Sequence, residues 1–489
     1  MKKLWCCLLV LCMLLPLAAC NTGDEESTKT PDDGVPTVDM NGYEYHAFLH
    51  NSPSSGVDYR YEGFEPKGQT DALPMSTYTR NQAIEEAYNC KITYQYAGRV
   101  ETDSEFKSLQ ESGTRFEVVI LKAPDLIRCA TMGLLRDLNA TEGLDLSGKG
   151  FDQNAVDQLS LGGQLYFVSG DMNYSAIDYT AAVAFNQTLW NEKKAEVAAR
   201  LGDAKYADLY GLVSSKEWTI ESMLKIAAAV NEDSDPLDGL PLSVEKGDTV
   251  GYYQYSPGAC YYYYAAGGRL SVQDANGYPV LTLGDESRQI YDALYQSLNL
   301  NLDQSFPSGI ETDHSKKMNS GNVLFSEYNL WELRHVLNRA DIDFAYGLLP
   351  IPTVSEGEEY YSTSLVLMSL CYWAIPVNCT SEQYAAEILE AMARYSQKIV
   401  TPAYDQAVAC KSLGTKDPSY RTLAQIRDSM IYDYALIYYN YSADMKALKV
   451  FSGFESAPEN EYDTYVTEDA VKLAQDFLNA QFAALRPAE

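Results

Sequence analysis

Along the first third of the chain, hydrophobic positions recur with two different periods, one typical of β-strands and one typical of amphipathic helices. The predicted strands are Tyr43–Leu49, 91–96 and 116–121, and the predicted helices are 80–89, 104–111 and 123–134. This order predicts a parallel sheet with helices on both faces, in which ligands bind beyond the carboxyl ends of the strands. The residues that follow the first and third strands are therefore the first candidates for a binding site.

The same reading continues to the end of the chain. It predicts a turn and strand over 162–168, a strand over 181–186, a helix from the N-cap Thr219 to Val230, a hairpin turn at Asn276-Gly277, and helices over 382–395 and 468–485. No internal repeat interrupts this pattern. The length of 489 residues suits two or three domains with a large buried core.

Charge and motif content narrow the functional class. The net charge of −31 argues against nucleic-acid binding, because phosphate backbones are repelled, and 46% hydrophobic residues argue against disorder. The four histidines have no metal-binding spacing, and the sequence lacks the common hydrolase and EF-hand motifs. Residues 143–150 nearly spell a phosphate-binding loop but lack the Ser or Thr that would hold Mg²⁺, so we interpret them as a surface loop. We therefore expect no enzyme activity, no metal and no cofactor.

The N-terminus reads as a secretory signal. Met1-Lys2-Lys3 is basic, and Leu4–Ala19 is an uncharged apolar run too short to span a bilayer. Leu17-Ala18-Ala19-Cys20 resembles a bacterial lipobox, which implies cleavage after residue 19 and a lipid anchor on Cys20. The protein is thus expected outside the cytoplasm, on the outer face of the cytoplasmic membrane or in a periplasm. Without Lys2 and Lys3 its net charge becomes −33.

Residues 20–40 are expected to form a disordered tether, because Asn21–Pro36 holds five acidic residues and two prolines but no aromatic ring. Six cysteines remain beyond the anchor: Cys90, Cys129, Cys260, Cys371, Cys379 and Cys410. Their even number permits disulfides, while buried free thiols are at least as consistent with a chain of this length.

An ordered series of short motifs resembles the family 1 extracellular solute-binding proteins, the class that includes maltose-binding protein. The matching segments are 133–138, 163–166, 183–190, 217–219, 265–268, 317–331, 346–350 and 373–376. The chain departs from the family pattern at Asn329-Leu330, where a glycine-containing turn usually precedes Trp331. It also lacks a clear acidic and basic pair in the loop after the third strand.

The resemblance implies an α/β, two-lobed periplasmic-binding-protein-like fold of type II with crossover hinge strands. It places one lobe at 41–176 plus 364–410 and the other at 177–363 plus 411–489. It also implies that a carbohydrate is held between the lobes and delivered to ABC transporter permease subunits by a monomeric binding protein.

Sugar binding requires aromatic faces for C–H surfaces and polar groups for hydroxyls. The chain has 39 Tyr and 5 Trp against 14 Phe, which favours rings that carry a polar tip. The resemblance makes Trp331 the first candidate, with a buried core position as the alternative, and Tyr255 the second. The further candidates are Tyr328, Glu327, Asp178, Lys122, Asp125 and Asn51, each of which has a packing or surface role as its alternative.

Two other classes remain open at this point. A surface hydrolase acting on glycans needs two carboxylates about 5–10 Å apart, a geometry that a sequence does not exclude. A sensory or adhesion lipoprotein on the same fold would pass its ligand to a different partner. Within the transport class, a peptide, a polyamine or a phosphorylated compound is an alternative ligand, although the acidity of the chain disfavours anions.

Overall fold

The computed structural model describes residues 37–50, 72–98, 101–239, 242–255, 259–300, 308–309, 319–337, 342–364, 367–409, 416–451 and 459–486. The predicted signal segment 1–19, Cys20, Asn51 and Cys410 lie outside these ranges, as does most of the predicted tether.

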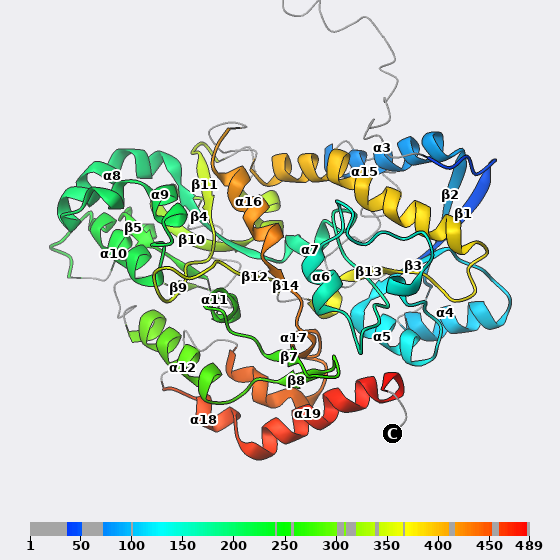
Figure 1. The fold of residues 1–489 in the computed structure, drawn as a ribbon. Helices are drawn as coiled ribbons and strands as arrows, with labels where there is room; N and C mark the ends of the chain where they lie inside the picture. The colour runs from blue at the N-terminus through cyan, green and yellow to red at the C-terminus, as the bar shows by residue number, and fades with distance from the viewer. Residues whose placement is uncertain are drawn as a thin grey trace, which may run out of the picture.

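The first sheet carries the N-terminal strands. In spatial order it contains β13 (Cys371–Ala374), β3 (Val118–Lys122), β1 (Tyr43–Leu49) and β2 (Cys90–Tyr96). β1 runs parallel to β2 and β3, as predicted, whereas β13 joins the edge in antiparallel orientation. α3 (Ala72–Tyr88) and α15 (Glu382–Val408) lie on one side of the sheet, and α4 (Thr102–Glu111) and α5 (Ala123–Thr131) lie on the other (Figure 1).

The second sheet is mixed. In spatial order it contains β11 (Tyr346–Leu349), β4 (Ala181–Asn186), β10 (Val323–Asn329) and β5 (Val250–Tyr252). Every residue of β4 is buried, because neighbouring strands flank it and helices cover the sheet. The helices of this lobe are α8 (Gln187–Leu201), α9 (Leu209–Ser214) and α10 (Ile220–Val230). The predicted N-cap is confirmed, since Thr219 accepts a hydrogen bond from the Ser222 amide within a capping box.

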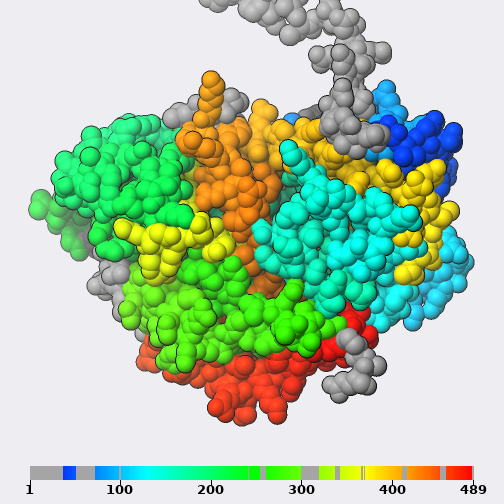
Figure 2. All heavy atoms as spheres, in the orientation of Figure 1, coloured from blue at the N-terminus to red at the C-terminus, as the bar shows by residue number. Residues whose placement is uncertain are grey.

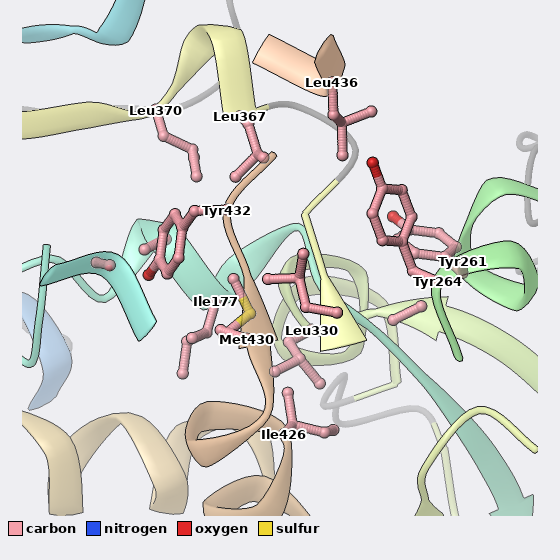
Figure 3. Packing of buried hydrophobic residues seen from close by; sticks show 14 of the residues in the cluster. Ile177, Tyr261, Tyr264, Leu330, Leu367, Leu370, Ile426, Met430, Tyr432 and Leu436 are labelled. Carbon is pink, nitrogen blue, oxygen red and sulfur yellow. The ribbon is translucent and has the colours of Figure 1, made fainter. Parts of the chain in front are cut away.

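A hydrophobic junction joins the two sheets. It contains α7 (Ser175–Asp178), the short helix α14 (Leu330–Glu332), α16 (Ser419–Asp428) and the parallel strand pair β12 (Ser362–Thr363) and β14 (Met430–Ile431). Ile177, Leu330, Ile426 and Met430 come from four of these elements and point toward one another (Figure 3). The chain therefore crosses between its two lobes through a packed core.

Two separate parts of the chain, 259–294 and 434–482, contribute to a layer along the lower edge of the molecule in Figure 1. It includes α11 (Ala259–Ala265), the hairpin strands β7 (Ser271–Gln273) and β8 (Pro279–Leu281), α12 (Asp285–Leu294), α17 (Tyr434–Ile437), α18 (Tyr462–Tyr465) and α19 (Glu468–Phe482). α19 contacts both β8 and α5, so the end of the chain packs against the β7–β8 hairpin and against a helix of the first sheet. The predicted lobe boundaries stay a prediction.

Two expectations change in detail, and a third, which was left open, is decided for five cysteines. The predicted strand over 162–168 forms only isolated bridges, Leu161 with Gln164 and Val168 with Trp373. The helix predicted to end at residue 395 continues to Val408 through Pro402, because its far half buries Val400, Tyr404 and Val408. Five cysteines are free thiols, namely Cys90, Cys129, Cys260, Cys371 and Cys379.

Candidate functional site

Trp331 lies at the start of a short helix that follows the central strand of the second sheet. Asn329 ends β10 and caps α14, accepting a hydrogen bond from the Glu332 amide at 2.8 Å. The departure from the family pattern at Asn329 is thus a helix cap, and it fixes the direction in which Trp331 leaves the strand. The half-buried indole stacks on Tyr179, with ring centroids 6.4 Å apart and planes 11° apart, and its other neighbour is His335 at 4.4 Å.

Asp178 lies directly before Tyr179 and is almost fully buried. Its carboxylate accepts hydrogen bonds from Arg334 Nε at 3.0 Å and Arg334 Nη2 at 2.5 Å, and from the Tyr404 hydroxyl at 2.9 Å. Burial lowers the pKa of Arg334, but the charge of Asp178 outweighs burial and raises that pKa above its usual range. The guanidinium also faces the rings of Tyr174 and Tyr404, at 5.8 and 5.5 Å from their centroids.

Lys122 and His50 lie at the carboxyl edge of the first sheet. The amide of His50 donates to the Ile120 carbonyl at 2.8 Å, which holds the end of β1 beside the end of β3. Burial lowers the pKa of His50 to about 4, and the charge of Lys122 contributes to this shift. His50 is therefore neutral at pH 7, and Lys122, which is partly exposed at the start of α5, carries the positive charge of this edge.

Asp125 belongs to a network inside the first lobe. It accepts a hydrogen bond from Thr102 at 2.6 Å and pairs with Arg128, which also contacts Asp103 at 2.8 Å. Burial raises the pKa of Asp125 despite these partners. The structure does not bring Asp125 to Trp331, and its predicted role as a ligand contact stays a prediction.

Glu327 and Tyr328 are fully buried in β10. The carboxylate of Glu327 accepts hydrogen bonds from the buried hydroxyls of Tyr252 in β5 and Tyr262 in α11. Tyr255 lies in β6 (Gln254–Tyr255), which pairs with β9 (Ser308–Gly309). Asn51 lies outside the described residues. Of the sequence candidates, the structure thus brings together Trp331 and Asp178.

A sequence comparison decides the family. The profile described as "Bacterial extracellular solute-binding protein" matches residues 80–399, which is more than half of the chain. The chain belongs to this family. Extracellular solute-binding proteins act outside the cytoplasm, so the family assignment agrees with the expected export. A comparison with curated protein sequences finds no match.

Solved structures of similar fold include three sugar-binding proteins. The acarbose-binding receptor GacH of Streptomyces glaucescens is 13% identical with a TM-score of 0.50, and the alignment covers 90% of this chain and 99% of that one. The cyclic α-maltosyl-1,6-maltose binding protein of Arthrobacter globiformis is 12% identical with a TM-score of 0.53, and the alignment covers 90% of this chain and 99% of that one. The lacto-N-biose complex of a binding protein from a Bifidobacterium longum ABC transporter is 13% identical with a TM-score of 0.52. The alignment covers 91% of this chain and 99% of that one. These similarities confirm the predicted two-lobed α/β fold.

Sequence reasoning missed the residues that complete the cluster around Trp331 in this solute-binding protein. Tyr179 follows a candidate directly, and Arg334 lies one helical turn after Trp331, but no local pattern connects the two segments. Their contact joins positions 156 residues apart. Within the described ranges, no group of three or more His, Cys, Asp or Glu could hold a metal ion, and no helix is long and apolar enough to cross a membrane.

The cluster combines two kinds of recognition surface. The aromatic rings of Trp331 and Tyr179 are only partly buried. Next to them, Asp178 and Arg334 form an ion pair that is largely shielded from solvent. The rings can cover the apolar face of a ligand, and the ion pair fixes the helix that carries Trp331. Together these side chains could bind a ligand that has an apolar face.

Proposed function

We propose that this solute-binding protein captures an oligosaccharide between its two lobes and delivers it to the permease subunits of an ABC importer. The observation that carries the proposal is the half-buried stack of Trp331 on Tyr179, next to the Asp178–Arg334 pair, in a chain of this family. Sugar rings have apolar faces that pack on aromatic surface, and the partly exposed side chains of Trp331 and Tyr179 supply such surface.

Two polar contacts of the site are proposed to come from the first lobe. Lys122 from the edge of the first sheet and Asn51 from the segment after β1 would donate hydrogen bonds to ligand hydroxyls. Tyr255 would add a further ring. A site of this kind rejects analogues that lack a hydroxyl, because its own polar groups would be left unpaired.

We further propose that Cys20 carries the lipid that anchors the mature protein to the membrane, where it acts as a monomer. Two or more acyl chains give stable anchoring. Cys20→Ser is expected to move the protein from the membrane fraction to the soluble fraction. An unchanged distribution would refute the anchor.

The sugar proposal is tested by calorimetric titration of the full chain with maltooligosaccharides, acarbose and lacto-N-biose. At least one is expected to bind, and Trp331→Ala is expected to weaken that binding by tenfold or more, while Trp331→Phe retains part of it because a ring remains. Tyr78→Ala removes an exposed aromatic ring on α3, away from the site, and serves as the matched control.

Three outcomes would contradict the proposal. Binding of peptides or polyamines but of no sugar would replace the ligand class. Equal binding by Trp331→Ala and the wild type would remove the aromatic stack from the site. If chromatography shows that a bound sugar is converted into product, the glycan-hydrolase alternative would be favoured over a transport receptor.

A further inference from the structure

His335 covers one face of the Trp331 indole. The two rings are stacked, with centroids 4.4 Å apart and planes 27° apart. His335 lies in the short helix η5 (Leu333–Leu337), four residues after Trp331, a spacing that places two side chains on the same side of a helix. The His335 side chain is exposed, so this imidazole forms the solvent side of the stack at the candidate site.

A hydrogen bond to the backbone decides which nitrogen of His335 carries a proton. Its Nδ1 lies 2.7 Å from the carbonyl oxygen of Trp331. A carbonyl oxygen only accepts hydrogen bonds, so Nδ1 carries the proton and donates it. In the neutral ring the other nitrogen, Nε2, is then an acceptor. Among the described residues, none donates a hydrogen bond to Nε2.

The charged side chains near Trp331 are already bound to protein partners. Asp178 accepts hydrogen bonds from Arg334 and from the Tyr404 hydroxyl. The buried carboxylate of Glu332 accepts one from the Asn329 amide at 3.3 Å. Each of these groups would have to give up a buried partner to bind a ligand, and leaving a buried donor or acceptor unpaired is costly. The exposed Nε2 of His335 pays no such cost.

We infer that His335 is a specificity-determining residue of the candidate site, where its Nε2 accepts a hydrogen bond from a hydroxyl group of the bound sugar. This inference rests on the proposed function and names the chemical group that the site recognises. The stack on Trp331 and the bond from Nδ1 hold the imidazole in one orientation before the ligand arrives. A contact made by a group already held in place loses less entropy on binding.

An acceptor in a fixed position selects ligands that donate to it. A sugar hydroxyl can donate, whereas a hydrogen or fluorine atom in its place cannot. Carboxylate and phosphate oxygens accept hydrogen bonds and do not donate them when ionised, so the neutral imidazole gives anionic ligands no bond. Nε2 therefore favours a neutral polyhydroxy ligand over an anion of the same shape.

Two variants of the full chain separate hydrogen bonding from ring stacking. His335→Phe keeps a ring on Trp331 but removes both nitrogens, and His335→Ala removes the ring as well. Calorimetric titration at about pH 8, where imidazoles are neutral, uses the sugar that binds the wild type. We expect both variants to bind it about fivefold or more weakly. Full affinity in His335→Phe would show that only stacking matters, and tighter binding by His335→Ala would show that the imidazole blocks the sugar; either result overturns the inference.

Ligand analogues test the direction of the hydrogen bond. At each hydroxyl position of the sugar, the deoxy and the deoxyfluoro analogues are titrated into the wild type and into His335→Phe. At one position we expect both analogues to lose about fivefold in the wild type and nothing in the variant, because fluorine accepts but does not donate. Equal losses in the two proteins at every position would overturn the inference, as would full affinity of every deoxyfluoro analogue.

His46→Ala is the matched control. His46 is also an exposed histidine, and its Nδ1 lies 2.7 Å from the Thr93 hydroxyl oxygen. It belongs to β1, which lies in deep blue at the upper right of Figure 2, whereas β10, which leads to Trp331, belongs to the sheet on the left in Figure 1. Its sugar affinity is expected to equal that of the wild type. A loss as large as that of His335→Phe would overturn the assignment to His335.

Nitrogen NMR of the histidine-labelled full chain tests the tautomer without a ligand. The chain has four histidines, and the signals that His335→Phe lacks belong to His335. We expect a protonated Nδ1 and a bare Nε2 at about pH 8, and the opposite tautomer would overturn the inference. If the wild type binds no sugar, the proposed function fails and the inference falls with it. If the wild type binds a sugar and both His335 variants bind it equally well, the inference alone fails.

Discussion

At the scale of single residues, the Asp178–Arg334 pair is the strongest interaction of the candidate site. The side chain of Asp178 is 2% exposed and that of Arg334 is 14% exposed, so neither charge is well solvated. Removing one partner from such a pair leaves the other charge buried without compensation, which costs far more than the loss of an exposed pair. The stability of the region around Trp331 therefore depends on this carboxylate.

We predict that Asp178→Asn lowers the free energy of unfolding by about 3 kcal/mol, because the Arg334 guanidinium loses its buried counter-charge. Urea unfolding followed by circular dichroism measures the change. Glu221→Gln breaks the exposed Glu221–Lys225 pair on α10 and should cost about 0.5 kcal/mol or less. Equal losses in the two variants would show that the buried pair contributes no more than a surface pair.

The same pair shows why the site was only partly predictable. Trp331 is a candidate because its local sequence resembles a family motif, and Asp178 is one because it lies near the expected first crossover between the lobes. Arg334 and Tyr404 were missed because their contacts with Asp178 connect positions more than 150 residues apart, and no periodicity records such contacts. Glu327 is a candidate because it is a neighbour of Trp331 in sequence, yet its carboxylate faces the hydroxyls of Tyr252 and Tyr262.

At the scale of elements, local chemistry was predictable where one short segment contains all of it. Asn276-Gly277 predicted the hairpin of β7 and β8, and Thr219 predicted the start of α10. The segment 162–168 has strand-like residues but forms only single bridges, because its partners are decided by the packing of distant segments. Pro402 marked no helix end, since the buried face of α15 continues past it.

The hairpin gives an element-scale prediction. Gly277 has φ +78°, its carbonyl accepts a hydrogen bond from the Gly162 amide, and an added Cβ would lie 3.0 Å from the Gly162 nitrogen. We expect Gly277→Ala to destabilise the protein by about 2 kcal/mol or more, because left-handed strain and a backbone clash add together.

The matched control is Gly267→Ala, which has φ +82° but open space around the new Cβ. It should cost about 1 kcal/mol from left-handed strain alone. Thermal unfolding of both variants gives the comparison. If both lose the same stability, the hairpin tip does not depend on its contact with Gly162.

At the scale of the whole molecule, the two sheets are joined by the narrow hydrophobic junction of α7, α14, α16, β12 and β14. The candidate site lies at this junction, because Asp178 ends α7 and Trp331 belongs to α14. A ligand that contacts Trp331 on one lobe and the edge of the first sheet on the other gains both sets of contacts only when the lobes approach. Ligand binding and lobe closure are then parts of one equilibrium.

We therefore predict that a saturating sugar ligand lowers the radius of gyration of the full chain in small-angle X-ray scattering. The reason is differential affinity, since a ligand shifts a two-state equilibrium only when it binds one state more tightly. Trp331→Ala at the same sugar concentration is expected to keep the ligand-free radius, because it loses the contacts that the closed form adds. A wild-type radius that stays constant while calorimetry shows binding would mean that the sugar is held by one lobe, and closure would then play no part in capture.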